Sequence, residues 1–202
     1  MQLQQGDSTL KFVAVELADF GTWENDFLPA FAAGVTAQVD VVATHFYSTC
    51  NQKDSDQTIF NTVPGFGTGV TNIFSILTNS AANPALKTVP VWVTENNVNA
   101  DFDKGSGISN CNGTTFVRDL RGSSPFFAAW RPYVFSQLGK AGAAALYQWV
   151  FADDTQYGEL DNQTGKPRLS YWVDYWLQHK FPAPPAPTCW TITLPTTPNW
   201  KL

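Results

Sequence analysis

The stretch Val89-Pro-Val-Trp-Val-Thr-Glu95 has the pattern of a β-strand that ends on a carboxylate. Its nearly continuous apolar side chains are typical of a strand buried on both faces of a parallel sheet. Asn96 follows directly, so the chain becomes polar at Glu95. Parallel α/β folds bind ligands at the carboxyl ends of their strands, which makes Glu95 the leading candidate for a catalytic residue. The structural alternative is a carboxylate that caps a loop or pairs with Arg118 or Arg121.

Strand-like and helix-like segments alternate along the rest of the chain. Runs of β-branched and apolar residues predict strands, and apolar residues spaced three and four apart predict helices. The expected strands are residues 10–16, 39–47, 89–95 and 143–150, and the expected helices are residues 27–33, 70–80, 125–138 and 168–179. This alternation indicates an α/β fold with right-handed crossovers and a parallel sheet.

The connections between these segments are unequal in length. Residues 48–69 and 96–122 are expected to be long loops that follow strands, whereas the returns from helix to strand are short. Barrels whose working face lies at the strand carboxyl ends show this asymmetry. A closed (β/α)8 TIM barrel needs eight strands, and only four are counted. We therefore expect about four βα units in residues 1–181, as an independent unit or as the carboxyl-terminal half of a barrel, and a Pro-rich extended tail in residues 182–202.

Polar and aromatic residues end the other expected strands. His45 and Tyr47 close the second strand, and strand alternation places both on one face. They are candidates to hydrogen-bond a hydroxylated ligand or to orient Glu95; the alternative is that loop backbone satisfies them. Trp149 ends the last strand and either stacks on a sugar ring or fills the core. Glu16 ends the first strand and is a second carboxylate at the same edge.

The composition excludes several classes of partner and cofactor. Twelve Lys and Arg against seventeen Asp and Glu give a net charge of −5, and no basic cluster indicates nucleic-acid binding. No apolar run reaches the roughly 18 residues that a membrane helix needs. The sequence has no glycine-rich phosphate loop, no metal-ligand spacing among its cysteines and histidines, and no Gly-x-Ser-x-Gly of an esterase. We expect no cofactor and no metal.

The cysteines and glycosylation motifs favour an extracellular protein. Cys50 and Cys111 lie in the loops after the second and third strands, on the same edge, and we expect them to form a disulfide, which leaves Cys189. Two Asn-x-Thr motifs begin at Asn112 and Asn162. Disulfides and N-glycosylation are features of secreted proteins. The export signal is then not in this chain.

Four motifs in order resemble the clan A retaining glycoside hydrolases. Pro90-Val-Trp-Val-Thr-Glu95 resembles their seventh-strand nucleophile motif, and Asp40-Val-Val-Ala-Thr-His-Phe-Tyr47 resembles the sixth strand, which often ends His-x-Tyr. Gln148-Trp149 is similar to the tryptophan of their eighth strand, and residues 157–171 resemble the stretch that follows it. The resemblance spans about residues 10–180 and specifies the clan rather than one sugar.

The resemblance implies strands five to eight of a TIM-barrel glycosidase. Glu95 would be the nucleophile of a double displacement on a β-linked oligo- or polysaccharide, and His45, Tyr47 and Trp149 would contact the sugar. The clan's acid/base is a glutamate that follows Asn at the end of strand four, whereas Glu16 follows Val15 and fits strand five. The acid/base would lie in a missing N-terminal half of the barrel, so we expect this isolated chain to be inactive. The alternative is a non-catalytic, carbohydrate-binding derivative of the barrel.

Overall fold

A computed structural model describes residues 9–18 and 23–180 of the 202-residue chain. The chain forms a mixed α/β fold around a four-stranded parallel sheet, which confirms the predicted parallel pairing. The sheet order follows the chain: β1 (Val13–Leu17), β2 (Val41–Thr49), β3 (Val91–Asn99) and β4 (Ala145–Leu146). A second, two-stranded parallel sheet pairs β5 (Ala152–Asp153) with β6 (Leu160–Asp161). The predicted tail, residues 182–202, lies outside the described residues.

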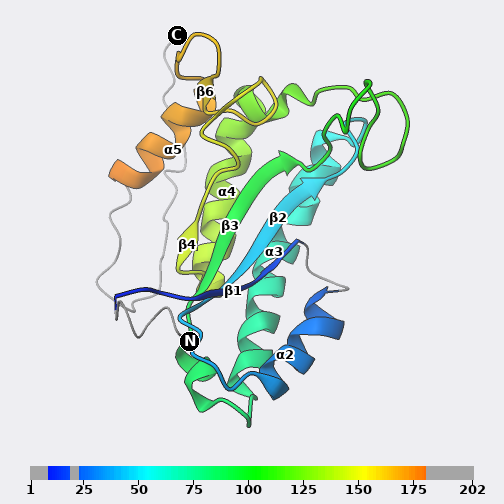
Figure 1. Ribbon diagram of the computed structural model, residues 1–202. Coiled ribbons are helices and arrows are strands. Elements are labelled where there is room, and N and C mark those ends of the chain that lie inside the picture. The colour runs from blue at the N-terminus through cyan, green and yellow to red at the C-terminus, as the bar shows by residue number, and fades with distance from the viewer. Residues whose placement is uncertain (1–8, 19–22, 181–202) are drawn as a thin grey trace.

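Helices follow the strands as the alternating pattern predicts. They are α2 (Leu28–Gly34), α3 (Asp56–Thr78), α4 (Pro125–Ala141) and α5 (Leu169–Lys180), with shorter helical turns at η1 (Trp23–Phe27), η2 (Pro84–Thr88) and η3 (Leu120–Ser123). In Figure 1, α3 and α4 run behind the sheet. The expected end of this helix at residue 138 is wrong, because α4 continues to Ala141 and stops at Gly142, which has a left-handed φ of 90° that glycine adopts without strain.

The expected loop at residues 48–69 is also wrong, because α3 occupies its second half. Ser55 caps the helix by accepting a hydrogen bond from the Thr58 amide at 3.1 Å. Buried residues then repeat at helical spacing, which extends the apolar stripe predicted for residues 70–80: Ile59, Val63, Phe66, Val70, Ile73 and Leu77. Pro64 and the glycines beside it favour a loop locally, but burial of this stripe outweighs that preference.

One of those glycines permits the contact between α3 and α4. A Cβ atom at Gly67 would lie 3.3 Å from the carbonyl oxygen of Gln137 in α4. The two helix backbones therefore approach each other closely at this point. The glycine that obscures the helix in the sequence thus allows a close helix contact that a larger side chain would push apart.

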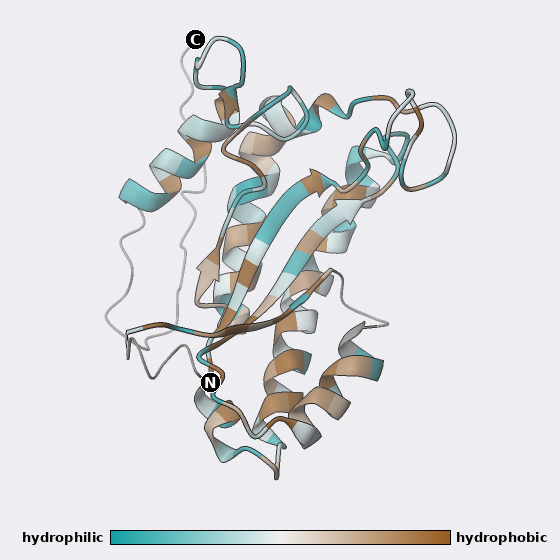
Figure 2. Cartoon of the chain, in the orientation of Figure 1, coloured by the Kyte–Doolittle hydropathy of each residue, from teal (hydrophilic) through white to brown (hydrophobic). Residues whose placement is uncertain are grey.

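The hydrophobic core lies between the sheet and α3 and α4. From the sheet, Val42, Phe46, Val91 and Val93 face the helices, and they pack with residues that include Ile59, Val63, Phe127 and Trp130. Burying one such apolar side chain contributes about 1.5–3 kcal/mol to stability. Figure 2 shows that β3 is hydrophobic at its start, hydrophilic along its middle and hydrophobic again at its tip, where Val98 joins the core. The central strands β2 and β3 are therefore apolar at their amino-terminal ends and carry most of their polar residues toward their carboxyl ends.

Candidate active site

A bulge in β3 directs Glu95 out of the helix-facing layer. Thr44 of β2 pairs with Val93, but the next residue, His45, pairs with Glu95, so Thr94 is an extra residue in β3. Val91 and Val93 face the helices, and strict alternation would place Glu95 on that side with them. The extra residue reverses the alternation, as bulges beside active sites often do. Glu95 therefore lies on the opposite face, with its side chain 25% exposed.

Tyr47 and His45, both of β2, contact the carboxylate of Glu95. The Tyr47 hydroxyl donates to Glu95 Oε2 at 2.9 Å, and His45 Nδ1 lies 3.4 Å from the same oxygen. Burial raises the pKa of Tyr47 well above its ordinary value, and the negative charge of Glu95 raises it further. The hydroxyl therefore keeps its proton and acts as a donor throughout the physiological pH range.

Glu16 lies on the other side of His45. Its Oε2 is 2.9 Å from His45 Nε2 and accepts a hydrogen bond from the Thr94 hydroxyl at 2.8 Å. Val15 and Glu16 have φ of 73° and 38°, which is uncommon for residues with a side chain, and β1 changes register against β2 there. The sequence placed Glu16 at this edge, but nothing in it indicated the contact with His45.

Trp149 lies beside the strand segment that follows Glu95. Its backbone amide donates to the Asn96 carbonyl at 3.1 Å, and its carbonyl accepts from Asn97 Nδ2 at 2.6 Å. The residue is 41% exposed, and the peptide bond that follows it is cis. The expected strand 143–150 forms a ladder only at Ala145–Leu146, although three amides between residues 144 and 149 donate to β3 carbonyls. Trp149 is thus held at the same edge of the sheet as Glu95.

The arginines proposed as alternative partners of Glu95 have other partners. Arg118 pairs with Asp154 at 2.5 Å, and Arg121 pairs with Asp119 at 2.6 Å. Within the described ranges, the contacts of Glu95 are with Tyr47 and His45 instead. Its carboxylate is therefore not neutralised by an arginine.

The predicted disulfide joins the loops beside this site. Cys50 and Cys111 are bonded, with their Cα atoms 5.8 Å apart and 61 residues apart in sequence. Closing a loop of that length stabilises the fold by about 4 kcal/mol in the chain-entropy model. Arg121 adds a second link, because it donates to the carbonyl oxygens of Gln52 at 3.0 Å and Asp54 at 2.7 Å. Both long loops are thus fixed to each other.

A buried ionic cluster lies behind Glu95, on the helix side of the sheet. Arg131 of α4 donates from Nη1 to the Asn96 side chain, and its Nε lies 2.8 Å from Asp174 Oδ1 in α5. The other oxygen, Asp174 Oδ2, is buried with no hydrogen-bond donor among the described residues. Burial raises the pKa of Glu159 to about 7, the charge of Asp174 adds to the rise, and Arg131 opposes it. A proton on Glu159 therefore removes the repulsion between its carboxyl group and that of Asp174.

The stability of the protein is expected to fall between pH 5 and 8 because of Glu159. Its ordinary pKa is 4.5 and its folded pKa is about 7, so between these values the folded chain holds a proton that the unfolded chain has lost. The contribution is complete below pH 4.5 and is lost as the pH rises through 7. Linkage sets an upper limit of about 3 kcal/mol, and partial exposure reduces it to about 1–2 kcal/mol.

Thermal unfolding from pH 5 to 8 measures this effect. Glu159→Gln should flatten the slope of Tm against pH, since the amide is uncharged at every pH. The carboxyls of Asp40 and Asp161 do not interfere, because hydrogen bonds hold their pKa values below the ordinary 3.8. An equal slope in the wild type and Glu159→Gln would show that Glu159 is already ionised at pH 5.

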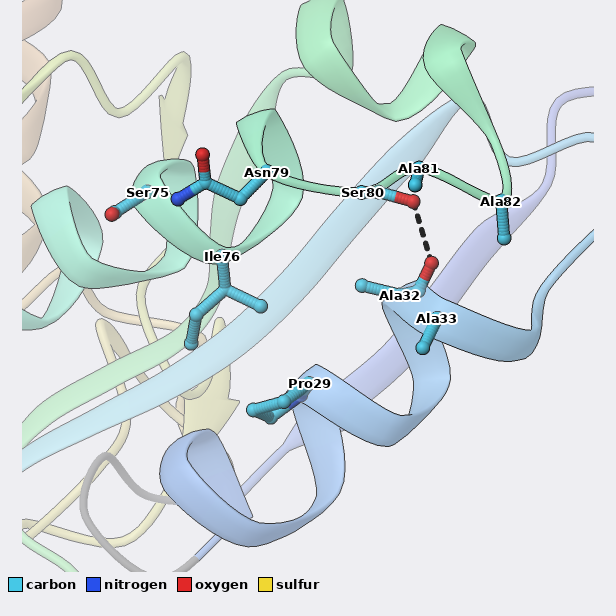
Figure 3. Close-up of a pocket in the computed structure, with 9 residues that line it drawn as sticks. All are labelled: Pro29, Ala32, Ala33, Ser75, Ile76, Asn79, Ser80, Ala81 and Ala82. Atoms are coloured by element: carbon cyan, nitrogen blue, oxygen red, sulfur yellow. Dashed lines mark hydrogen bonds between the residues drawn. The ribbon is translucent and has the colours of Figure 1, made fainter.

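A groove elsewhere on the chain has no comparable chemistry. It has a volume of about 680 Å³ and lies between α2 and the end of α3 (Figure 3). Its lining is mostly small or apolar, and the polar Ser80 is occupied by donating to the Ala32 carbonyl at 2.5 Å. Because α3 ends before β3 begins, the groove is at the amino-terminal end of the strands, away from Glu95.

Comparison with known proteins adds no assignment: no family model matches the chain, and neither does any curated protein. Among residues 9–18 and 23–180, no group of three or more His, Cys, Asp or Glu side chains is arranged to hold a metal ion. The helices within those ranges are each too short or too polar to cross a membrane. The candidate site therefore has to be judged on its own geometry.

Proposed function

We propose that this chain is the carboxyl-terminal half of a retaining glycoside hydrolase that cleaves β-linked oligo- or polysaccharides. The observation that carries the proposal is the Glu95 carboxylate at the carboxyl end of a parallel sheet, where it is partly exposed. The contacts from Tyr47 and His45 both fall on Oε2. No described residue donates to Oε1, so that oxygen is the one available to attack a sugar.

The proposed reaction is a double displacement at the anomeric carbon. A Glu95 oxygen forms a bond to that carbon while the bond to the leaving oxygen breaks, and the product is a glycosyl ester. Water then attacks the same carbon and releases Glu95 as a carboxylate. Tyr47 holds the carboxylate by donation to Oε2 throughout, since its raised pKa keeps the hydroxyl protonated.

The acid/base of this reaction is assigned to a partner half of the barrel. Retaining enzymes place the second carboxyl group about 5–5.5 Å from the nucleophile. The 202 residues contain no Asn-Glu pair of the kind that ends strand four in the clan. The consecutive order β1-β2-β3-β4 is what strands five to eight of a (β/α)8 barrel would have, which supports the proposed partner. The Cys50–Cys111 disulfide supports a secreted protein.

An activated substrate tests the nucleophile without the acid/base. A dinitrophenolate leaving group needs no proton, so the chain should react by itself with 2,4-dinitrophenyl 2-deoxy-2-fluoro-β-glycosides, whose fluorine slows hydrolysis of the ester. We expect one glycosyl unit per chain by intact mass, located by peptide mapping on Glu95. The gluco, galacto, manno and xylo forms would identify the sugar.

Two variants make the labelling specific. Glu95→Gln should remain unlabelled, whereas Asp26→Asn, which removes one exposed charge from η1, should label like the wild type. A folded chain that stays unlabelled with all four sugars, or one labelled at another residue, would contradict the proposal. Sugar binding without labelling would support the alternative function, a non-catalytic carbohydrate-binding derivative of the barrel. The observation that favours this alternative is the absence of an Asn-Glu pair in the chain.

A further inference from the structure

His45 lies between two carboxylates that approach different ring nitrogens. Nε2 is 2.9 Å from Glu16 Oε2, and Nδ1 is 3.4 Å from Glu95 Oε2. An ionised carboxylate only accepts hydrogen bonds, so the closer partner requires a proton on Nε2. The partner of one ring nitrogen determines which tautomer a histidine adopts.

We propose that Glu16 is a positioning residue that fixes the tautomer and the ring orientation of His45 and thereby points Nδ1 at Glu95. With the Nε2 proton held by Glu16, Nδ1 is the ring nitrogen that faces the nucleophile. A proton on Nδ1, 3.4 Å from Glu95 Oε2, would attract the carboxylate electrostatically as it leaves the glycosyl ester. This catalytic consequence depends on the proposed function, whereas the tautomer depends only on the geometry.

The bulge connects Glu16 to the nucleophile. Thr94 is the extra residue that turns Glu95 toward the exposed face, and its hydroxyl donates to the Glu16 oxygen that contacts His45. The Thr94 hydroxyl also donates to the Thr44 carbonyl oxygen at 3.4 Å, and this contact holds the Thr94 side chain against β2. One residue therefore positions Glu95 through the backbone and Glu16 through its side chain.

The second histidine provides an internal reference. His179 Nδ1 lies 2.6 Å from the carbonyl oxygen of Tyr175, which accepts only, so Nδ1 carries the proton there. The chain has two histidines, and their contacts require opposite tautomers. Long-range ¹H–¹⁵N spectra of the chain labelled with ¹⁵N-histidine distinguish the two forms, and His179→Gln assigns the signals.

The test compares the wild type with Glu16→Ala and Thr94→Val at a pH where both rings are neutral. We expect His45 to be mainly the Nε2–H form in the wild type. In Glu16→Ala it should become a mixture in which the Nδ1–H form rises at least severalfold. Thr94→Val, which keeps a strand-favouring side chain, should shift it in the same direction. His179 should not change in either variant, and Asp26→Asn should leave both rings unchanged.

An unchanged His45 tautomer in both variants would overturn the proposal, and so would a wild-type ring protonated on Nδ1 alone. The readout needs no substrate, so its failure is separate from a failure of the labelling at Glu95. Where labelling succeeds, Glu16→Ala should slow hydrolysis of the glycosyl ester by about 10- to 100-fold and leave KM for formation of the ester within about threefold. If Glu16 had a purely structural role, Glu16→Ala would change neither the tautomer of His45 nor the rate of ester hydrolysis relative to the KM for ester formation.

Discussion

Glu95→Gln is expected to lower the rate of dinitrophenolate release from 2,4-dinitrophenyl β-glycosides by about 10⁴-fold or more, as loss of a covalent nucleophile does in other enzymes. The amide is nearly the same size as the carboxylate and still accepts from Tyr47, so the site should stay in place. Only the nucleophilic oxygen is lost. The measurement is the initial release of dinitrophenolate, followed by absorbance, with Asp26→Asn as the matched control.

Chemical rescue separates a lost nucleophile from a damaged site. Glu95→Ala leaves space where the carboxylate stood, and added azide should attack the anomeric carbon from that side. We expect azide to restore dinitrophenolate release and to give the α-glycosyl azide, since a single displacement inverts the configuration. Activity of Glu95→Gln within tenfold of the wild type, or a β-glycosyl azide from Glu95→Ala, would remove Glu95 from the mechanism.

The sequence predicted the parallel sheet and the grouping of Glu95, His45 and Tyr47 because both depend on local patterns. Apolar runs and helical spacing set the order of the elements, and that order fixes parallel pairing. Residues that end neighbouring parallel strands meet at one edge, so His45 and Glu95 became register partners. The cysteines followed from the same reasoning, since both loops leave that edge.

The sequence did not predict the bulge at Thr94, although the position of Glu95 depends on it. Val91, Val93 and Glu95 have the same parity, so simple alternation places the carboxylate in the core with the valines. Polar contacts across elements outweigh alternation here: Asn96 meets Arg131 on the helix side, and Thr94 meets Glu16 on the other. Such contacts join residues 35 and 78 positions apart, which no local window includes.

The buried cluster was missed for a related reason, although the sequence contains a signal for it. Arg131 and Asp174 each interrupt an aromatic, apolar helical stretch, which is unusual for residues that are almost never buried unless paired. A charge inside the apolar stretch of each of two predicted helices therefore indicates that the two charges pair. What the sequence lacks is the third partner, since Glu159 lies in an irregular segment.

Arg131→Met is expected to destabilise the fold by about 3–5 kcal/mol, because it leaves the buried Asp174 carboxylate without its partner. The Arg131 side chain is 4% exposed and bonds to both α5 and β3, so methionine fills part of the volume but satisfies neither acceptor. For a chain of this size the loss corresponds to a fall in Tm of about 6–20 °C, measured by thermal unfolding at pH 7.

Two further variants distinguish loss of a buried charge partner from loss of packing. Arg118→Met removes an exposed arginine from its ion pair with Asp154, and solvent screening should limit that effect to about 1 kcal/mol. Arg131→Met combined with Asp174→Leu should recover part of the stability lost in the single variant, because no buried charge remains unpaired. The free energies of unfolding lost in Arg131→Met and in Asp174→Leu alone give the sum expected if the two side chains act independently. A double variant that loses this full sum would show that the cluster does not hold α4, α5 and β3 together.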